Sequence, residues 1–394
     1  MNIKSLLLGS AAALIAVSGA RAADAVVVAE PEPAEYVKIC DVYGEPEPAE
    51  YVKICDVYGA GYFYIPGTET CLRIGGYVRY DASLGQVGSF NGARATDVLS
   101  GKEQDTWAKN ARFTLKTWTG QETELGTLKT YTETRINFGN TGTSGLYNPE
   151  TETWGPGAAN KGITLNFAWI QLGGLRVGKD ESAFNTFIGY AGNVINDTLV
   201  PYGDFDTNVV QYYFDAGNGF SAVASLEQGS GSSNGYIGTI DSYMPHVVGG
   251  LKYTQGWGAI TGVAAYDSNY EEWAGKVRLD VNATNELTLW VMGGYGSDKN
   301  TFRNFYKQWG GNWAVWGGGT YKFNEKTSFN LQVSYDEAKE FGLAANVAYD
   351  IVPGFTITAE VDWANATKYG ASWTGIPAGK TNAVGGILRF QRSF

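Results

Sequence analysis

From Leu72 to Phe394 the chain alternates short segments of period-two hydrophobicity with connectors that run long, short, long, short. Residues 276–282, for example, place Val277, Leu279 and Val281 on one face and polar side chains on the other. Every backbone polar group needs a partner within lipid, so strands that cross a membrane must close into a barrel with long loops at one rim and tight turns at the other. The pattern therefore predicts an all-β fold, a transmembrane antiparallel β-barrel of about sixteen strands.

The end of the chain fits a barrel better than a soluble sheet. Residues 386–394 continue the alternation and stop on Phe394. A soluble domain has no reason to finish in mid-strand on an exposed aromatic residue, whereas the last strand of a barrel pairs with the first. We therefore interpret Phe394 as an assembly signal. Side chains do not fill the lumen of a barrel with this many strands, so we expect an aqueous channel.

The N-terminus has the pattern of a secretory signal peptide, which we assign to residues 1–22. Lys4 provides a basic start, residues 5–19 form an apolar run, and Ala20-Arg21-Ala22 is a small-residue cleavage site. The apolar run is too short for a retained membrane helix. Cleavage removes Lys4 and Arg21 and no acidic residue, so the net charge changes from −11 to −13. The predicted location is the outer membrane of a Gram-negative bacterium.

Composition argues against catalysis and cofactor binding. Phe, Trp and Tyr make up 14% of the residues, which suits the aromatic girdles of a membrane barrel. The chain has one histidine, His246, and three cysteines, so little material is available for a metal or a catalytic base. We interpret His246 as a wall residue near the start of a strand and expect no enzyme activity and no cofactor. The acidic net charge argues against nucleic-acid binding.

Residues 45–59 repeat residues 30–44 letter for letter. Two copies are too few for a solenoid, so we interpret the repeat as a tandem duplication of the gene segment or as an assembly error in the recorded sequence. It lies within a periplasmic N-terminal segment, residues 23–71, that precedes a barrel of residues 72–394. In an oxidising compartment Cys55 and Cys71 are candidates for a disulfide. Cys40 would then be free, or would compete for Cys71.

One long connector, residues 181–208, differs from the others because it is rich in apolar and aromatic residues. Such a composition favours packing over disorder. We expect this connector to fold into the lumen, pack on the barrel wall and narrow the pore. The alternative is an extracellular loop that packs against a neighbouring subunit.

Basic residues occupy the polar face of the first three barrel segments. They are Arg73, Arg79, Arg112, Lys116, Lys129 and Arg135. Opposite them the long connector carries three acidic residues, Asp197, Asp204 and Asp206. We expect the two sets to produce a transverse field that orients dipolar solutes and sets ion preference. The alternative is that these charges are scattered, solvated wall residues.

Three stretches are similar to alphaproteobacterial porins of the Brucella and rhizobial type. They are CDVYGAGYFYIPGTETCLRIGGYVRYD, GGLRVGKDESAFNTFIGYAGN and the final GGILRFQRSF. The resemblance covers essentially the whole chain and implies a homotrimeric general-diffusion porin for small hydrophilic solutes and ions, set in outer-membrane lipid and lipopolysaccharide. It also implies that the third long loop enters the lumen, with Pro201, Tyr202, Asp204 and Phe205 at the constriction. The doubled N-terminal segment departs from the family pattern.

Three other functions stay open on the sequence alone. A sugar-selective channel would use inward aromatic residues such as Trp118, Tyr77 and Tyr131, although they form no continuous ladder in the sequence. A barrel enzyme would need a histidine paired with an acid or a serine at the rim, for which only His246 is available. An adhesin barrel would be narrow or plugged.

Overall fold

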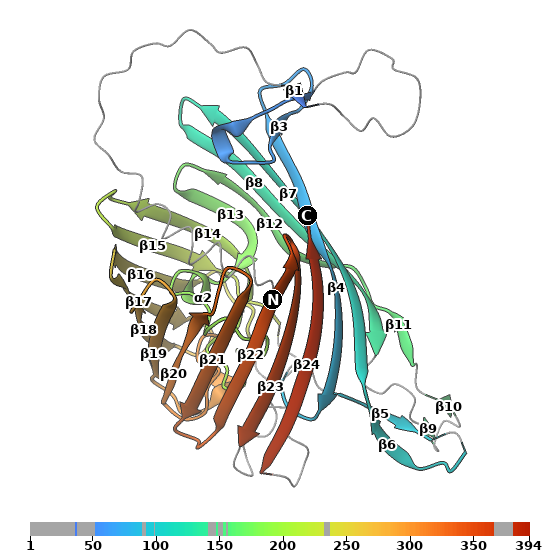
Figure 1. Cartoon of the computed structure of the whole chain (residues 1–394). Helices are drawn as coiled ribbons and strands as arrows, with labels where there is room; N and C mark the ends of the chain where they lie inside the picture. The colour runs from blue at the N-terminus through green and yellow to red at the C-terminus, as the bar shows by residue number, and fades with distance from the viewer. Residues whose placement is uncertain are drawn as a thin grey trace, which may run out of the picture.

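The computed structural model describes residues 36–37, 52–88, 92–97, 99–140, 147–148, 153–154, 157–231, 237–365 and 381–394. Its main unit is a closed antiparallel barrel of sixteen strands (Figure 1). In chain order the strands are β4 (Cys71–Gly85), β7 (Ala108–Thr123), β8 (Gly126–Asn140), β12 (Thr164–Leu172), β13 (Leu175–Glu181), β14 (Asp206–Asp215), β15 (Phe220–Glu227), β16 (His246–Gln255), β17 (Gly258–Asp267), β18 (Glu272–Asn282), β19 (Leu287–Gly296), β20 (Trp313–Lys322), β21 (Thr327–Asp336), β22 (Phe341–Val352), β23 (Phe355–Asn365) and β24 (Asn382–Ser393). The predicted fold class and strand number are confirmed.

The barrel closes where the last strand meets the first. β24 pairs with β4 in antiparallel register, with Arg389 opposite Asp81 and Ser393 opposite Tyr77. The terminal Phe394 continues this pairing, because its amide and carbonyl both hydrogen-bond to the backbone of Gly76 at 3.1 Å. The mid-strand ending of the sequence therefore has a structural counterpart in the seam of the barrel.

Side chains alternate between the lipid face and the lumen along each strand. On β4, Ile74, Val78 and Tyr80 are exposed on the outer surface, whereas Tyr77 and Arg79 point inward. Aromatic side chains gather near the ends of the outer face, as in the pairs Trp273–Tyr295, Trp313–Tyr335 and Phe341–Trp363, with ring centroids 5.7, 6.0 and 5.0 Å apart. These pairs all lie at the long-connector rim, where they match an aromatic girdle at one membrane interface.

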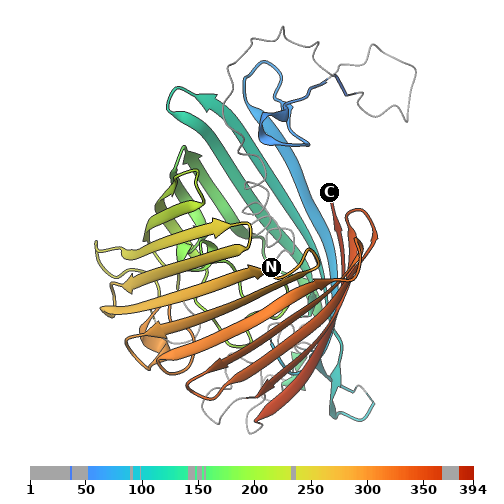
Figure 2. The same cartoon turned by 60° about the vertical axis from the view of Figure 1, so that its left-hand side comes forward.

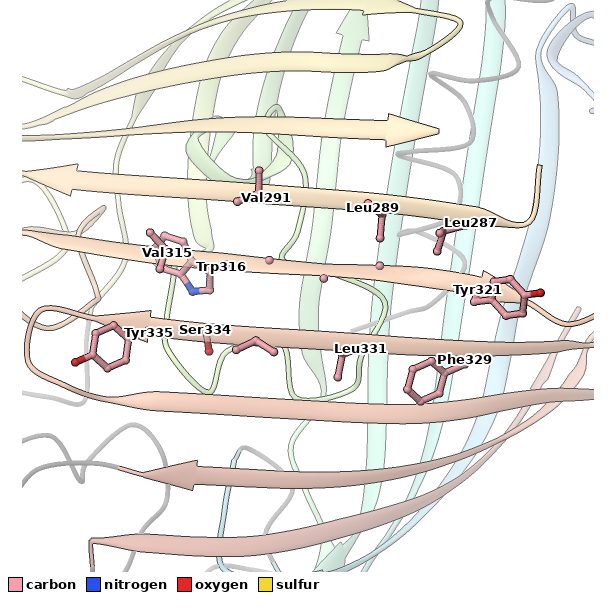
Figure 3. A pocket seen from close by; sticks show the side chains of 14 residues that line it. Leu287, Leu289, Val291, Val315, Trp316, Tyr321, Phe329, Leu331, Ser334 and Tyr335 are labelled. Carbon is pink, nitrogen blue, oxygen red and sulfur yellow. The ribbon is translucent and has the colours of Figure 1, made fainter. Parts of the chain in front are cut away.

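The outer wall has an apolar groove of about 700 Å³ across β19, β20 and β21 (Figure 3). Gly317, Gly318 and Gly319 lie in the middle of β20 and contribute no side chain there. Leu289 and Leu331 flank the glycines from the neighbouring strands, and Tyr321 and Tyr335 lie toward the two ends. The groove belongs to the lipid-facing surface and lies outside the lumen.

The two rims of the barrel differ as the connectors predict. Tight turns such as 216–219, 283–286 and 353–354 join strands at one rim. Long connectors at the other rim carry the hairpin of β5 (Ala93–Thr96) and β6 (Glu103–Thr106), the short pair β9 (Tyr147–Asn148) and β10 (Thr153–Trp154), and β11 (Ala158–Asn160), as Figure 1 shows. No helix in the described ranges has the length and apolar character needed to cross a membrane.

A small N-terminal segment lies at the tight-turn rim (Figure 1). It contains β2 (Val52–Lys53), a 3-10 turn η1 (Asp56–Tyr58) and β3 (Phe63–Tyr64), which pairs with β4. Cys55 and Cys71 form a disulfide with a Cα–Cα distance of 6.0 Å. β1 (Tyr36–Val37), from the first repeat copy, pairs with β2 from the second. Residues 1–22 and Cys40 fall outside the described residues.

Candidate pore constriction

The loop between β13 and β14, residues 182–205, has a closed base and its own fold. Ser182 donates its amide to the carbonyl of Phe205 at 2.7 Å, which joins the two ends of the loop. The Ser182 hydroxyl then caps the short helix α2 (Ala183–Thr186) by accepting from the amide of Phe184. The loop therefore leaves the wall and returns to it at one point.

This loop, which we call the constriction loop, lies inside the barrel on the inner faces of β16 to β23, and α2 is visible within the lumen in Figure 1. Wall side chains bind its backbone along its length. Trp316 Nε1 donates to the carbonyl of Val200 at 2.8 Å, and Gln332 Nε2 donates to that of Asp197 at 2.7 Å. Glu360 accepts from the amides of Ile195 and Asn196. The prediction that the third long loop is folded into the lumen is confirmed.

One buried lysine holds the base of the loop. Lys276 on β18 donates to Asn185 Oδ1 at 2.6 Å and to the carbonyl of Tyr202 at 2.7 Å. Its amino group lies 4.1 Å from the ring centroid of Phe184. A buried amino group is tolerated when oxygens and ring faces surround it, so Lys276 anchors the base of the loop.

The predicted basic residues Arg79, Arg112, Lys116 and Arg135 come together on the inner face of β4, β7 and β8. Glu133 links two of them, at 3.0 Å from Lys116 and 2.6 Å from Arg135. Arg112 Nε donates to the amide oxygen of Asn137 at 2.8 Å. We call this set, with its neighbours on β24, the basic wall. In the order of strands round the barrel, the basic wall lies opposite the strands β17, β18 and β19. Figure 2 shows the blue and teal strands on the far side of the lumen from the yellow and orange ones.

Sequence reasoning missed the contribution of the last strand to the basic wall. Arg389 on β24 forms an ion pair with Asp81 at 2.7 Å, and Gln391 accepts hydrogen bonds from Arg79 at 2.9 and 2.8 Å. Both residues occupy alternate positions with Ile387 on the inward face of β24. The period-two pattern of the terminal segment could therefore have predicted that they face the lumen. Only closure of the barrel brings them beside β4.

The other two predicted wall residues lie nearer the tight-turn rim. Arg73 is the third residue of β4, and its guanidinium lies 4.7 Å from the centroid of the Trp118 ring. Lys129 is the fourth residue of β8 and stands opposite Gly120. The six predicted basic residues therefore divide into four at mid-wall and two toward the rim.

The three predicted acidic residues do not form one surface facing the basic wall. Asp197 is buried between the loop and the strands behind it and accepts a hydrogen bond from the Tyr202 hydroxyl at 2.6 Å. Asp204 Oδ1 accepts from the amide of Phe205 at 2.9 Å. Asp206 is the first residue of β14 and pairs with Lys179.

The residues implied at the constriction pack inside the loop. Tyr202 is fully buried and meets the rings of Phe205 and Trp316 edge-on, with centroids 5.4 and 6.4 Å away. Pro201, between Val200 and Tyr202, is also buried. These side chains shape the loop from within.

An aromatic row crosses the inner wall beside Arg73. Trp118, Tyr131 and Trp169 stand directly opposite one another on β7, β8 and β12. Trp118 and Tyr131 stack at 5.3 Å with an interplanar angle of 26°, and Tyr131 lies 5.6 Å from Trp169. The guanidinium of Arg176 lies 4.0 Å from the Trp169 ring centroid. The row is continuous, contrary to the sequence interpretation, which lacked Trp169.

The rings of the aromatic row pack on one another and on two guanidinium groups. Trp118 and Tyr131 overlap face to face, whereas Tyr131 and Trp169 are tilted by 51°. Arg73 and Arg176 cover the two outer faces. These contacts occupy part of the ring faces in the row.

The His246 side chain is packed and hydrogen-bonded within the protein. It is the first residue of β16, is fully buried, and stacks on Phe305 with ring centroids 5.9 Å apart. Nδ1 accepts from the amide of Ser268 at 3.0 Å, and Nε2 lies 2.9 Å from the carbonyl of Gly238. Across the described ranges, no cluster of three or more His, Cys, Asp and Glu residues could hold a metal ion.

Comparison with known proteins agrees with this architecture. A family model described as "Porin subfamily" matches residues 24–45 and 44–387, two stretches that meet at the boundary between the repeat copies. Porin Omp2b of Brucella suis biovar 1 and that of Brucella canis are 54% and 53% identical to the chain over 400 residues, with 100% of both chains covered. The outer membrane channel DcaP of Acinetobacter baumannii has the same fold at a TM-score of 0.58 and 16% identity, covering 84% of this chain and 99% of that one. Pseudomonas putida OprB gives a TM-score of 0.52 at 12% identity, covering 82% and 94%.

Proposed function

The chain belongs to the porin subfamily, and on that premise we propose that its pore narrows between the constriction loop and the basic wall. The protein is a channel of the Gram-negative outer membrane through which small hydrophilic solutes and ions diffuse passively, and it is not an enzyme. The observation that carries the proposal is the position of the loop. It packs on β16 to β23, whereas the basic wall occupies the next strands round, β24, β4, β7 and β8.

An excess of positive charge on the basic wall supports a field across this gap. The wall has five cations, Arg79, Arg112, Lys116, Arg135 and Arg389, against two carboxylates, Asp81 and Glu133, so three cations are in excess. Fixed charges around a narrow aqueous passage set ion preference and orient dipolar solutes. Since Asp197 points into the loop packing, the field in this proposal comes mainly from the wall and less from the loop acids.

The test is reconstitution of the mature protein in planar lipid bilayers. We expect steady single-channel currents and a reversal potential under a salt gradient that depends on Arg79 and Arg112. Swelling of liposomes in sugars of increasing size should give flux that falls with size and does not saturate. Liposomes that stay sealed to salts and small sugars would refute the channel itself.

We also propose that the N-terminal segment, residues 23–71, faces the periplasm and that three barrels assemble into a trimer. Tight turns are periplasmic in outer-membrane barrels, and this segment lies at the tight-turn rim. The trimer, embedded in outer-membrane lipid and lipopolysaccharide, is implied by the family resemblance. Native mass spectrometry in detergent tests it, and a barrel that stays monomeric under mild extraction would contradict it.

A sugar-selective channel is the second candidate. The continuous aromatic row favours it, but Trp118 stacks on Tyr131, and the guanidinium groups of Arg73 and Arg176 lie over Trp118 and Trp169, so these contacts occupy part of the ring surface that a sugar would need. Passive general diffusion therefore remains the better-supported function.

A further inference from the structure

A second connector also folds inward. Residues 297–312 join β19 to β20 and contain the 3-10 turn η2 (Thr301–Arg303). After this turn, Phe305, Tyr306, Lys307 and Trp309 are all fully buried. We call residues 297–312 the second loop. From the sequence we singled out only residues 181–208 as an apolar connector, although the aromatic residues at 305, 306 and 309 were a signal for packing here too.

The second loop is anchored on strands far from its own. The amide of Phe305 donates to Asp267 Oδ2 on β17 at 2.7 Å, and its ring stacks on His246 of β16. The Tyr306 hydroxyl donates to Glu227 on β15 at 3.1 Å. All three wall residues lie at the long-loop ends of their strands. The loop therefore crosses the inner wall from β19 to β15.

The same residues hold the constriction loop. The ring of Tyr306 meets that of Phe184 at 5.3 Å, and the carbonyl of Phe305 accepts from the amide of Asp204 at 3.3 Å. Trp309 packs edge-on against Trp316 at 5.5 Å. Trp316 in turn donates to the constriction-loop backbone. The second loop thus touches the constriction loop near both of its ends.

The second loop is internally braced, and the wall leaves room for it. The ammonium of Lys307 donates to three carbonyls of its own loop, those of Lys299, Trp309 and Gly311, at 3.3, 3.2 and 2.8 Å. Under the loop the wall has Gly294, where an added Cβ would lie 3.1 Å from the Trp309 ring. The close fit between Gly294 and the Trp309 ring indicates that the second loop has one fixed position on the wall.

From these contacts we propose that the second loop is a clamp that keeps the constriction loop on the wall and, through it, sets the size limit of the pore. This inference rests on the proposed constriction. Tyr306 and Trp309 act as positioning residues, because they contact the constriction loop and its supports and do not contact a solute. Loss of the clamp frees the constriction loop to leave the wall, so the open cross-section fluctuates and larger solutes pass.

The experiment compares three variants with the wild type in single-channel recording and in liposome swelling with sugars of increasing size. Y306A removes the ring contact with Phe184 and the hydrogen bond to Glu227, and leaves the backbone contact between Phe305 and Asp204. F302A is the matched control, because Phe302 belongs to the same loop but is 43% exposed and lies outside the buried cluster. In the third variant a two-residue turn replaces residues 298–310. The short turn is compatible with the hairpin because the amide of Gly296 already donates to the carbonyl of Asn312 at 2.8 Å.

We expect Y306A and the turn variant to lose the single steady current level and to pass larger sugars, whereas F302A matches the wild type. Heat-dependent mobility on denaturing gels verifies that each barrel is folded, and the turn variant provides the test if Y306A does not assemble. Wild-type currents and an unchanged size limit in a folded turn variant would overturn the inference. The proposed constriction has a separate readout, because the shift in ion preference on changing Arg79 and Arg112 does not depend on the second loop.

Discussion

The basic wall yields a quantitative prediction for the double variant R79Q/R112Q. Both guanidinium groups donate to neutral amide oxygens, those of Gln391 and Asn137. Glutamine keeps a long polar side chain at each position and removes two of the five wall cations. We expect the permeability of the pore to anions relative to cations to fall.

The size of this effect follows from Coulomb's law in a water-filled lumen. A monovalent ion that passes about 7 Å from a guanidinium changes its free energy by about 0.6 kcal/mol in water. At 0.1 M salt, screening with a Debye length of about 10 Å reduces this to about 0.3 kcal/mol. The two charges stabilise an anion and destabilise a cation by the same amount. Removing both therefore changes the free-energy difference between an anion and a cation in the pore by about 1.2 kcal/mol, which is roughly sevenfold in the permeability ratio. At 1 M salt, where the Debye length is about 3 Å, the change falls below about twofold.

The assay is the reversal potential in a salt gradient, measured at low and at high ionic strength. R73Q is the matched control because it removes the same charge from the tight-turn side of the wall, where Arg73 lies on Trp118. An unchanged reversal potential for R79Q/R112Q at low salt would refute the proposed field. An equal shift in R73Q would show that the charges act throughout the lumen and are not concentrated at a constriction.

Three further predictions concern other parts of the molecule. The variant C55S/C71S loses a crosslink that closes a short loop, which lowers the stability of the N-terminal segment by about 3 kcal/mol. Proteolysis of this segment should therefore accelerate while conductance stays at the wild-type value. Equal proteolysis rates would count against a stabilising disulfide. K276M leaves two constriction-loop oxygens without a donor at a cost of about 1–3 kcal/mol each, so single-channel current noise should rise above that of the wild type. W118A/W169A should leave sugar flux non-saturating, as in the wild type. Sugar flux that saturates in the wild type and no longer saturates in W118A/W169A would revive the sugar-selective function.

Local patterns in the chain were sufficient for the barrel. Period-two alternation identified the strands, and parity within each strand placed Arg79, Arg112, Lys116 and Arg135 on the lumen face, because successive side chains on a strand point to opposite sides. The apolar composition of residues 181–208 was enough to predict an inward loop, since such a segment is more stable when packed than in water.

Contacts between distant segments were beyond the reach of the sequence. Arg389 joins the basic wall only because the last strand closes against the first. The Asp197 carboxylate points into its own loop, because it accepts a hydrogen bond there from the Tyr202 hydroxyl. The spacing of residues along the chain does not predict this orientation. The aromatic row needed Trp169 in register with Tyr131, and the register depends on the pairing of β8 with β12.

The amino-acid sequence by itself determined that this protein is a membrane barrel with a wet interior, because period-two alternation and the lengths of the connectors are encoded residue by residue. Tertiary structure alone decided how the interior is filled: which wall the constriction loop lies on, and that residues 297–312 enter beside it. Both depend on side chains such as Tyr306 and Lys276 that meet partners many residues away, and only the closed barrel brings those partners within reach.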